Sequence, residues 1–332
     1  MTKIQLFNKK KGRIKLTDFI YKYISNSKKG DLYKNSYRNV ANHLLNFEKK
    51  TGILIYTDSF SEQVAEEFIL YLKTEGRIKG STNSKGLGLM QNTIKTIIDK
   101  IAAMIKRSGR QGYPVNYDYE CIQVSGEDPN AVYLTVDELN KLNELGGLSK
   151  QSEAVRDRFL VGCFTALRFS DYSTINTSNI IKGNFEVKTK KTGTKVIIPI
   201  HPIIIDIIKR NKGDLPSLPS QQSFGKTIKR ICKKAKIVHE VLYERTIGTK
   251  IVRKKMPKWE LVSSHTARRT GATNMYISGI PVFRIMLITG HRTEQSFFKY
   301  IRIGKEENAI ELKNFLFFKN DYLYSKIRND NT

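Results

Sequence analysis

The segment QNTIKTIIDKIAAMIKRSGR, residues 91–110, places isoleucine at positions 94, 97, 98, 101 and 105. Spacings of three and four residues bring these side chains onto one face of an α-helix, so the segment predicts a long amphipathic helix. A helix of this kind depends on other helices that pack against its apolar face. The segment therefore indicates a helical bundle in the first third of the chain.

Apolar stripes with the same periodicity precede this segment. They lie in residues 16–30, 31–52 and 59–76, and each stretch ends in glycine, a common helix stop. We expect Asp31 to cap the second helix and Ser61 to cap the third. Residues 16–115 are thus predicted to form a helical bundle domain, preceded by a basic segment at residues 1–15.

The pattern changes after this bundle. Residues 116–133 are rich in turn-forming residues and predict a linker. Residues 134–318 predict a second domain that is mainly α with a small β-sheet, followed by a tail at 319–332. We expect strand pairs within 179–200 and 240–256, the second turning at Ile247-Gly248, and helices at 136–146, 156–175, 202–210, 221–236, 264–278, 281–288, 293–300 and 305–318.

The charge of the chain indicates its partner. The sequence has 58 Lys and Arg against 31 Asp and Glu, a net charge of +27 that is spread over both halves. Solubility alone needs a net charge of only roughly 2–8 in a small domain, so the excess favours a large polyanion. The charge does not separate DNA from RNA, but no RNA-binding signature is evident. Candidate phosphate contacts on the solvated face of the 91–110 helix are Lys95, Lys106, Arg107 and Arg110.

Cysteine usage and hydropathy exclude other classes. Cys121, Cys163 and Cys232 have no CxxC spacing, so neither a disulfide framework nor a metal site is expected. There is no signal-peptide pattern and no apolar run of about eighteen residues, so no membrane span is expected. A reducing cytoplasm is the expected location.

Arg168 interrupts an apolar helix in the sequence GCFTALRFSD. An arginine at the end of such a run needs an anion, because leaving a charge buried without a partner costs roughly 3–5 kcal/mol. Asp171, three residues later, is one available partner. A bound anion from outside the chain is the other.

Lys191 lies in the turn of the strand pair VKTKKTGTKVIIPI. Gly193 permits a tight reversal there, and a hairpin turn can extend a lysine into a groove. Lysines in turns are common, and Lys190 is adjacent, so the sequence leaves the choice between these two open.

His265 and Arg268 are three residues apart in SSHTARRTGATNM, where Ser263 or Ser264 is expected to cap a helix. Residues at i and i+3 share a helix face, so the imidazole and guanidinium can reach one anion near the helix N-terminus. Arg269 points elsewhere, toward phosphate or the core. A surface helix with scattered polar groups is the alternative.

His291 and Tyr300 stand nine residues apart in GHRTEQSFFKYIR. Gly290 ends a short apolar helix, and His291 follows directly. We expect Tyr300 about two turns along the next helix, with Phe297 and Ile301 anchoring its buried face. Packing in the core is the alternative role for this tyrosine.

Taken in order, these residues resemble the catalytic motifs of the tyrosine recombinase (phage-type integrase) family. The resemblance rests on TALRFSD around Arg168, KTGTKVIIPI from Lys191, HTARRT from His265, the Gly-His pair at 290–291, and Tyr300. The helical segment before them is similar to that family's SAM-like core-binding domain. HTARRTGATNM and the apolar C-terminal segment look most like integrases of Bacteroidetes mobile elements.

The resemblance implies a mechanism without metal or cofactor. Arg168, Arg268, His265 and His291 would stabilise the charged phosphate, and Tyr300 would attack it to form a 3′-phosphotyrosyl bond. Lys191 would protonate the leaving 5′ oxygen. The resemblance also implies a homotetramer on double-stranded DNA with specific recombination sites, a monomer or weak oligomer when free, and possible accessory directionality proteins.

The sequence departs from the family's pattern at two positions. Ala166 stands where glycine is usual, and a methyl group in a helix should be harmless; Arg269 stands where histidine is common. Two other activities stay open. A type IB topoisomerase uses similar chemistry to relax DNA, and a catalytically inactive DNA-binding regulator could retain the scaffold.

Overall fold

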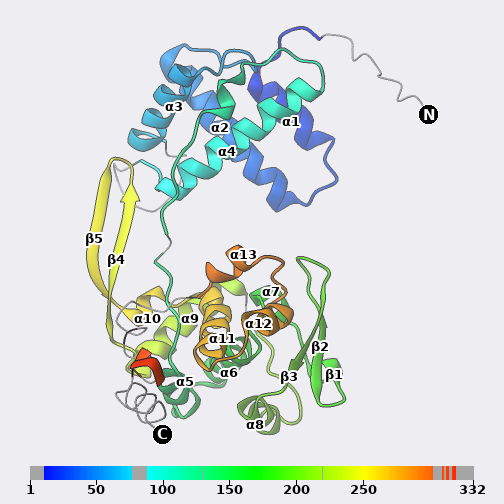
Figure 1. The fold of residues 1–332 in the computed structure, drawn as a ribbon, viewed down its shortest axis with the longest axis vertical. Helices are drawn as coiled ribbons and strands as arrows, with labels where there is room; N and C mark the ends of the chain where they lie inside the picture. Colours follow the sequence, from blue (N-terminus) through cyan, green and yellow to red (C-terminus); the bar gives the residue numbers. More distant parts are fainter. Residues whose placement is uncertain are drawn as a thin grey trace, which may run out of the picture. The chain divides into compact units, whose positions relative to one another are not determined.

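The computed structural model describes residues 11–76, 88–128, 130–218 and 220–301, together with 309, 312–313 and 316–318. The chain divides into two compact units (Figure 1). The first comprises Met1–Asn130 and Leu242–Lys254, and the second comprises Ala131–Val241 and Lys255–Thr332. The predicted class, mainly helical with small antiparallel sheets, is confirmed.

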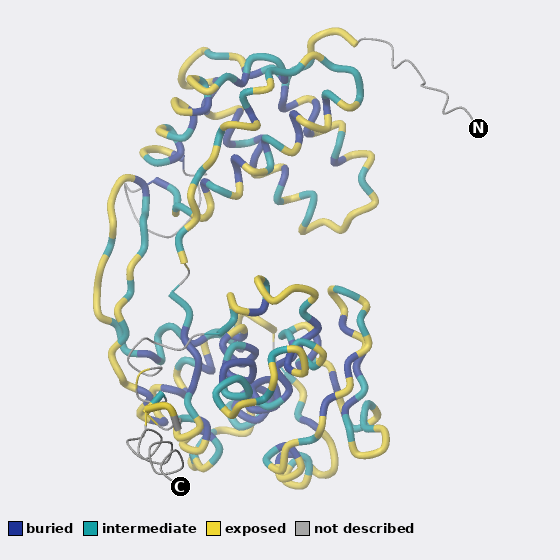
Figure 2. The backbone as a smooth tube through the Cα atoms, viewed as in Figure 1, coloured by how far each residue is buried: buried dark blue, intermediate teal, exposed yellow. Residues whose placement is uncertain are grey.

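The first unit is the predicted helical bundle. It contains α1 (Leu16–Ser25), α2 (Asp31–Thr51), α3 (Glu62–Thr74), α4 (Gln91–Arg110) and the 3-10 turn η1 (Tyr117–Glu120). The isoleucines of α4 that define the apolar face are all buried, and so are most side chains in the apolar stripes of α1, α2 and α3 (Figure 2). The hydrophobic effect of covering these faces holds the bundle together.

Two helix starts differ in how well they were predicted. Ser61 caps α3 as expected, since its side chain accepts a hydrogen bond from the Val64 backbone N–H at 3.3 Å. The expectation for Asp31 is wrong: Gly30 is the N-cap of α2, and Asp31 is the first helical residue. In that position the negative charge of its carboxylate still interacts favourably with the positive N-terminal end of the helix dipole.

Parts of the predicted basic segment and linker pack on the bundle. The Lys11 backbone N–H donates to the Gly112 carbonyl at 2.9 Å, and Arg13 Nε lies 2.7 Å from Asp58 Oδ1. Tyr119, within the expected linker, is buried in the bundle core. Residues 1–10 lie outside the described residues.

The second unit surrounds the buried helix α6 (Lys150–Thr165). The other helices of this unit are α5 (Val136–Asn143), α7 (Phe169–Tyr172), α8 (Pro202–Arg210), α9 (Gln221–Lys234), α10 (Lys258–Leu261), α11 (Ser264–Ile277), α12 (Val282–Thr289) and α13 (Glu294–Phe298), with the 3-10 turns η2 (Thr177–Asn179) and η3 (Leu316–Phe318). Thr135 caps α5, within a capping box formed with Glu138. Helices α6 and α11 lie side by side at the centre of the unit (Figure 1).

A small antiparallel sheet lies at the edge of the second unit, with strand order β1-β2-β3. The strands are β1 (Ile180–Ile181), β2 (Asn184–Lys188) and β3 (Lys195–Pro199). The β2 and β3 side chains alternate between buried and outward positions, which is why the sequence alternation predicted this pair. The short β1 was not predicted.

The second predicted strand pair forms a hairpin of β4 (Glu240–Ile247) and β5 (Lys250–Pro257). Its turn contains Gly248 with φ of +61°, and the Gly248 N–H donates to the Leu89 carbonyl at 2.9 Å. A Cβ at this position would lie 2.4 Å from the Lys73 carbonyl oxygen, so only glycine fits. These contacts place Leu242–Lys254 in the first unit, whereas the sequence-based division kept residues 134–318 together.

The predicted C-terminal helix at 305–318 lies largely outside the described residues, as does the tail at 319–332. Among the residues that the structure describes, no helix combines the length and apolar character that a membrane crossing requires.

Candidate active site

Arg168 is placed by an abrupt end of helix α6. The helix stops at Thr165, Ala166 adopts the left-handed conformation with φ of 51°, and Arg168 becomes the N-cap of α7. The predicted break at Arg168 is therefore present, but the expectation that Ala166 lies in a helix is wrong. A left-handed conformation costs a residue with a Cβ about 1–2 kcal/mol, so the methyl group is not neutral here.

The carboxylate of Asp171 serves the β2–β3 turn. Its Oδ1 accepts the backbone N–H of Lys190 at 2.9 Å, which ties the turn to the start of α7. In the described part of the chain, Asp171 Oδ2 and Arg168 Nη1 are both buried without a hydrogen-bond partner. The ion pair between Arg168 and Asp171 that the sequence suggested therefore does not supply a hydrogen bond to either atom. Arg168 Nη1 remains available to donate to another acceptor.

Arg268 lies on α11, within the second unit and almost fully buried. Its Nη1 donates to the Ala166 carbonyl at 2.9 Å, and its Nη2 donates to the Thr289 carbonyl at 2.7 Å. Burial and the nearby Arg168 guanidinium lower the pKa of Arg268 to about 10, so it stays charged at neutral pH. Its Nε has no hydrogen-bond partner within the described residues. The two arginines thus form a buried cationic site with unused donors.

His265 and Lys191 lie beside these arginines. Ser263 is the N-cap of α11, and His265 stands exposed in the first turn, as the sequence predicted. Although its side chain is exposed, the protein atoms around the imidazole partly desolvate it and lower the pKa of His265. The charges of Arg269, Arg268, Lys191 and Arg168 lower this pKa further. Lys191 is therefore near enough to act on this imidazole.

The neighbouring lysines have other positions in the turn. Lys190 is exposed, and its backbone is held by Asp171. Lys195 forms an ion pair with Glu186. The charge of Lys191 contributes to the lowered pKa of His265.

His291 emerges from the end of α12, as predicted. Gly290 caps the helix with φ of 68°, and the turned chain brings His291 Nε2 within 3.1 Å of Arg268 Nη2. His291 Nδ1 lies 2.9 Å from Thr289 Oγ1. Burial, followed by the charges of Arg268 and Arg168, lowers the pKa of His291 to about 4, so the imidazole is neutral at pH 7.

Tyr300 lies just beyond α13, not two turns along it. The helix ends at Phe298, and the Tyr300 N–H donates to the Phe297 carbonyl at 2.7 Å in a following turn. Phe297 is fully buried. Tyr300 and Ile301 are partly buried and pack against the same cluster. The Tyr300 ring centroid lies 4.7 Å from that of His291 and 5.2 Å from Arg268 Cζ.

The second unit thus brings together the six residues selected from the sequence. They come from the starts of α7 and α11, the β2–β3 turn, the end of α12 and the turn after α13. Buried guanidinium donors and a positive helix N-terminus favour an anion here, because each would stabilise negative charge. A phenol beside this site can act as an oxygen nucleophile.

Comparisons with known protein families agree with this arrangement. Residues 15–124 match the phage integrase SAM-like domain, and residues 132–307 match the phage integrase family. This chain belongs to the phage integrase family. No curated protein matches the chain.

Solved integrases share this fold at low sequence identity. A lambda integrase dimer bound to a COC′ core site is 14% identical with a TM-score of 0.61, covering 88% of this chain and 78% of that one. The Tn1549 transposon integrase in complex with circular intermediate DNA is 16% identical with a TM-score of 0.62, covering 90% and 99%. A lambda integrase tetramer bound to a Holliday junction is 15% identical with a TM-score of 0.56, covering 84% and 78%.

The basic residues expected to contact phosphates in this integrase differ in their surroundings. Lys95 forms an ion pair with Asp99 at 2.9 Å, and Arg107 lies over the Tyr23 ring at 4.8 Å. Lys106 and Arg110 are exposed on α4. Arg269 is half-buried on α11, one position beyond Arg268.

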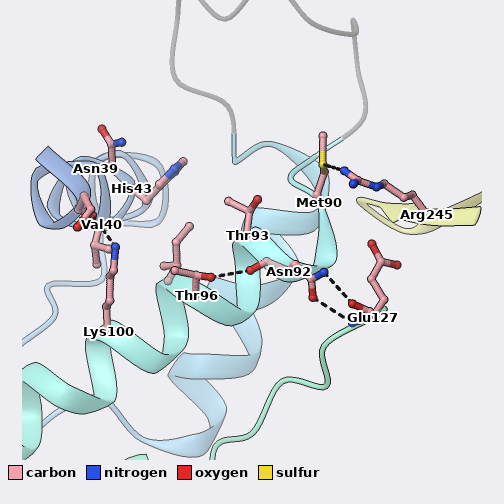
Figure 3. A pocket seen from close by; sticks show the side chains of 12 residues that line it. Asn39, Val40, His43, Met90, Asn92, Thr93, Thr96, Lys100, Glu127 and Arg245 are labelled. Carbon is pink, nitrogen blue, oxygen red and sulfur yellow. Dashed lines mark hydrogen bonds between the residues drawn. The ribbon is translucent and has the colours of Figure 1, made fainter. Parts of the chain in front are cut away.

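A cavity of about 400 Å³, lined by polar and apolar side chains, lies in the SAM-like unit (Figure 3). Asn39 and His43 of α2, and Thr93 and Thr96 of α4, line it together with Lys100. Lys100 donates to the Ser36 carbonyl at 3.4 Å, and burial lowers its pKa. Sequence reasoning missed this cavity because its lining comes from segments that are far apart in the chain, from Ser36 to Arg245.

Proposed function

We propose that this integrase cleaves and rejoins DNA at specific sites through a 3′-phosphotyrosyl bond to Tyr300. The observation that carries the proposal is the pair of buried guanidinium donors, Arg168 Nη1 and Arg268 Nε, which lack partners in the described part of the chain. Tyr300 lies against Arg268. A phosphate has two nonbridging oxygens that could accept hydrogen bonds from these donors. A phosphate bound there would lie near the Tyr300 oxygen nucleophile.

The proposed reaction follows from the charges. The two arginines bind nonbridging oxygens of the scissile phosphate, whose negative charge increases in the transition state. His265 and His291 surround the same phosphate. The Tyr300 oxygen bonds to phosphorus, and the 5′ oxygen leaves with a proton from Lys191. The covalent bond to tyrosine stores the energy of the broken strand, so rejoining needs neither a cofactor nor a metal.

The proposed DNA interface uses both units. Exposed Lys106 and Arg110, with Lys95, Arg107, Lys190 and Arg269, are candidates for phosphate contacts, which fix position without reading sequence. Asn39 and Thr93, which line the cavity of the SAM-like unit, are candidates for base contacts, because amide and hydroxyl groups match base edges in the major groove.

The proposed assembly is a homotetramer on two DNA sites, formed from monomers or weak oligomers. Its support is the lambda integrase tetramer bound to a Holliday junction, which has the same fold. We further propose that the chain integrates or excises a mobile element, of the type found in Bacteroidetes, in the bacterial cytoplasm at the nucleoid, with accessory proteins that set direction.

Strand exchange between two duplexes tests this function. Covalent complexes trapped on random-sequence DNA identify the site, and two labelled duplexes that carry it are then incubated with the protein. A recombinase produces duplexes with exchanged ends. Relaxation of supercoiled DNA without exchange would support the type IB topoisomerase activity instead, and binding without any covalent adduct would support an inactive regulator.

A further inference from the structure

Thr289 is buried completely at the end of α12, beside the active site but outside the residues that would touch DNA. Its hydroxyl hydrogen is already committed, because Oγ1 donates to the Ile285 carbonyl at 2.8 Å. A hydroxyl has a single hydrogen, so toward His291 Nδ1, at 2.9 Å, Oγ1 can only accept. The proton of the neutral imidazole must then be on Nδ1.

The other side of the ring leads to the same tautomer independently. Arg268 Nη2 lies 3.1 Å from His291 Nε2, and a guanidinium can donate but not accept. Nε2 must therefore hold a lone pair. The same Nη2 donates to the Thr289 carbonyl at 2.7 Å, so Thr289 orients both the imidazole and the guanidinium that faces it.

We propose that Thr289 is a positioning residue that holds His291 in the Nδ1–H tautomer, so that Nε2 can accept the phenolic proton of Tyr300. This inference rests on the proposed cleavage reaction and assigns His291 a role as proton acceptor within it. The ring centroids of His291 and Tyr300 are 4.7 Å apart, and Arg268 contacts both rings.

The phenolic proton moves from Tyr300 to His291 once a phosphate is bound. A bound phosphate draws the donors of Arg268 to its own oxygens and releases the Nε2 lone pair. The Tyr300 O–H bond breaks and an Nε2–H bond forms, leaving a phenolate and an imidazolium. The phenolate oxygen bonds to phosphorus, while the 5′ oxygen leaves with a proton from Lys191. The imidazolium then donates from Nδ1 to Thr289 and from Nε2 to a phosphate oxygen.

The surroundings of His291 are consistent with a neutral resting state. The charged and titratable groups facing it are Arg268 from α11, Arg168 at the start of α7, and Tyr300 after α13. Burial and, after it, the charges of these two arginines keep the ring unprotonated until a bound phosphate offsets the cationic charge. A neutral imidazole with a fixed tautomer is what a proton acceptor requires.

The test compares Thr289→Val, which keeps the shape but removes the hydroxyl, with Thr289→Ser, which retains it. The rate of adduct formation is measured in single turnover on the trapped duplex. At pH 7 we expect Thr289→Val to be slower by about 10–100-fold, since proton transfer contributes at least about 100-fold in such reactions. Thr289→Ser should restore most of that rate. Thr227→Val, at another buried threonine of the second unit, is the matched control.

The pH profile separates positioning from structural damage. The Thr289→Val defect should shrink as the pH rises, because hydroxide in solution can then take the phenolic proton that His291 would otherwise accept. A defect of equal size at every pH, or a Thr289→Ser variant as slow as Thr289→Val, would overturn the proposal.

Nitrogen-15 NMR of the histidine rings tests the tautomer without any DNA. His291 is assigned by the signal that disappears in His291→Gln. A proton on Nδ1 supports the proposal, and a proton on Nε2 overturns it. If the wild-type protein forms no adduct with any DNA, the proposed function fails, and this spectrum still decides the role of Thr289.

Discussion

Gly271 of α11 lies so close to Cys163 of α6 that a Cβ at Gly271 would be 2.3 Å from the Cys163 carbonyl oxygen. The same Cβ would be 2.8 Å from the Ala166 methyl group. This close approach lets Arg268, one turn earlier on α11, reach the Ala166 carbonyl at 2.9 Å. The packing of two helix backbones therefore sets the position of an active-site guanidinium.

Gly271→Ala should destabilise the protein. Overpacking of this kind costs about 1–3 kcal/mol, which exceeds the gain in helix propensity of about 1 kcal/mol. Gly225→Ala is the matched control, because Gly225 lies within α9 with nothing within 4 Å of an added Cβ. We expect urea unfolding to show a lower free energy of unfolding for Gly271→Ala and a higher one for Gly225→Ala. Equal gains in both variants would contradict the close helix approach.

Arg168→Ala should impair cleavage more than binding. The guanidinium would interact most strongly with the charge of the transition state, and loss of one such donor costs about 10²–10³-fold in rate. Adduct formation and equilibrium DNA binding are measured on the same duplex. Weaker binding with normal cleavage of the bound DNA would count against this role.

The stability of the protein should fall in mild acid because of His291. Its pKa is about 4 when folded and about 6.5 when unfolded, so between these values the unfolded chain binds more protons. The contribution is fully present above pH 6.5 and is lost as the pH falls toward 4. Urea unfolding at pH 7 and pH 5 should show a smaller loss in His291→Gln than in the wild type. An identical loss in both would place the titration elsewhere.

Lys191→Ala should slow cleavage of an ordinary phosphodiester strongly. A DNA substrate with sulfur at the bridging 5′ position should restore the rate, because a thiolate leaves without a proton from a general acid. Lys190→Ala provides the comparison within the same turn and should change neither rate greatly. Rescue of Lys190→Ala, and not of Lys191→Ala, would exchange the two assignments.

Contacts of the SAM-like unit should separate into two types. Lys106→Ala should weaken binding to all sequences and lower the slope of log affinity against log salt by about 0.9, as expected for one lost phosphate contact. Asn39→Ala should instead reduce discrimination between the recombination site and altered sites. Fluorescence anisotropy titrations at several salt concentrations measure both effects. If Asn39→Ala changed only the salt slope, the cavity would not read bases.

The sequence predicted features that depend on local periodicity or on motif order. The isoleucine spacing of α4, the glycine that stops α12 and the alternation of β2 and β3 are properties of neighbouring residues. The order of the motifs pointed to six candidate active-site residues, which the second unit places together.

Features that depend on tertiary contacts could not be predicted in this way. The left-handed Ala166 faces Arg268 from 102 residues away, and Asp171 holds the Lys190 backbone from 19 residues away. The hydroxyl of Thr289 acquires a role only because Arg268 fixes the opposite side of the imidazole.

The most direct test of the account is the identity of the residue that becomes bonded to DNA. The protein is incubated with a nicked duplex that traps the covalent complex, and the adduct is digested and located by mass spectrometry. We expect a phosphotyrosyl bond at Tyr300, absent in Tyr300→Phe although that variant still binds DNA, and retained in Tyr276→Phe. An adduct that persists in Tyr300→Phe, and that disappears when Tyr276, Tyr322 or Tyr324 is changed to phenylalanine, would contradict the account.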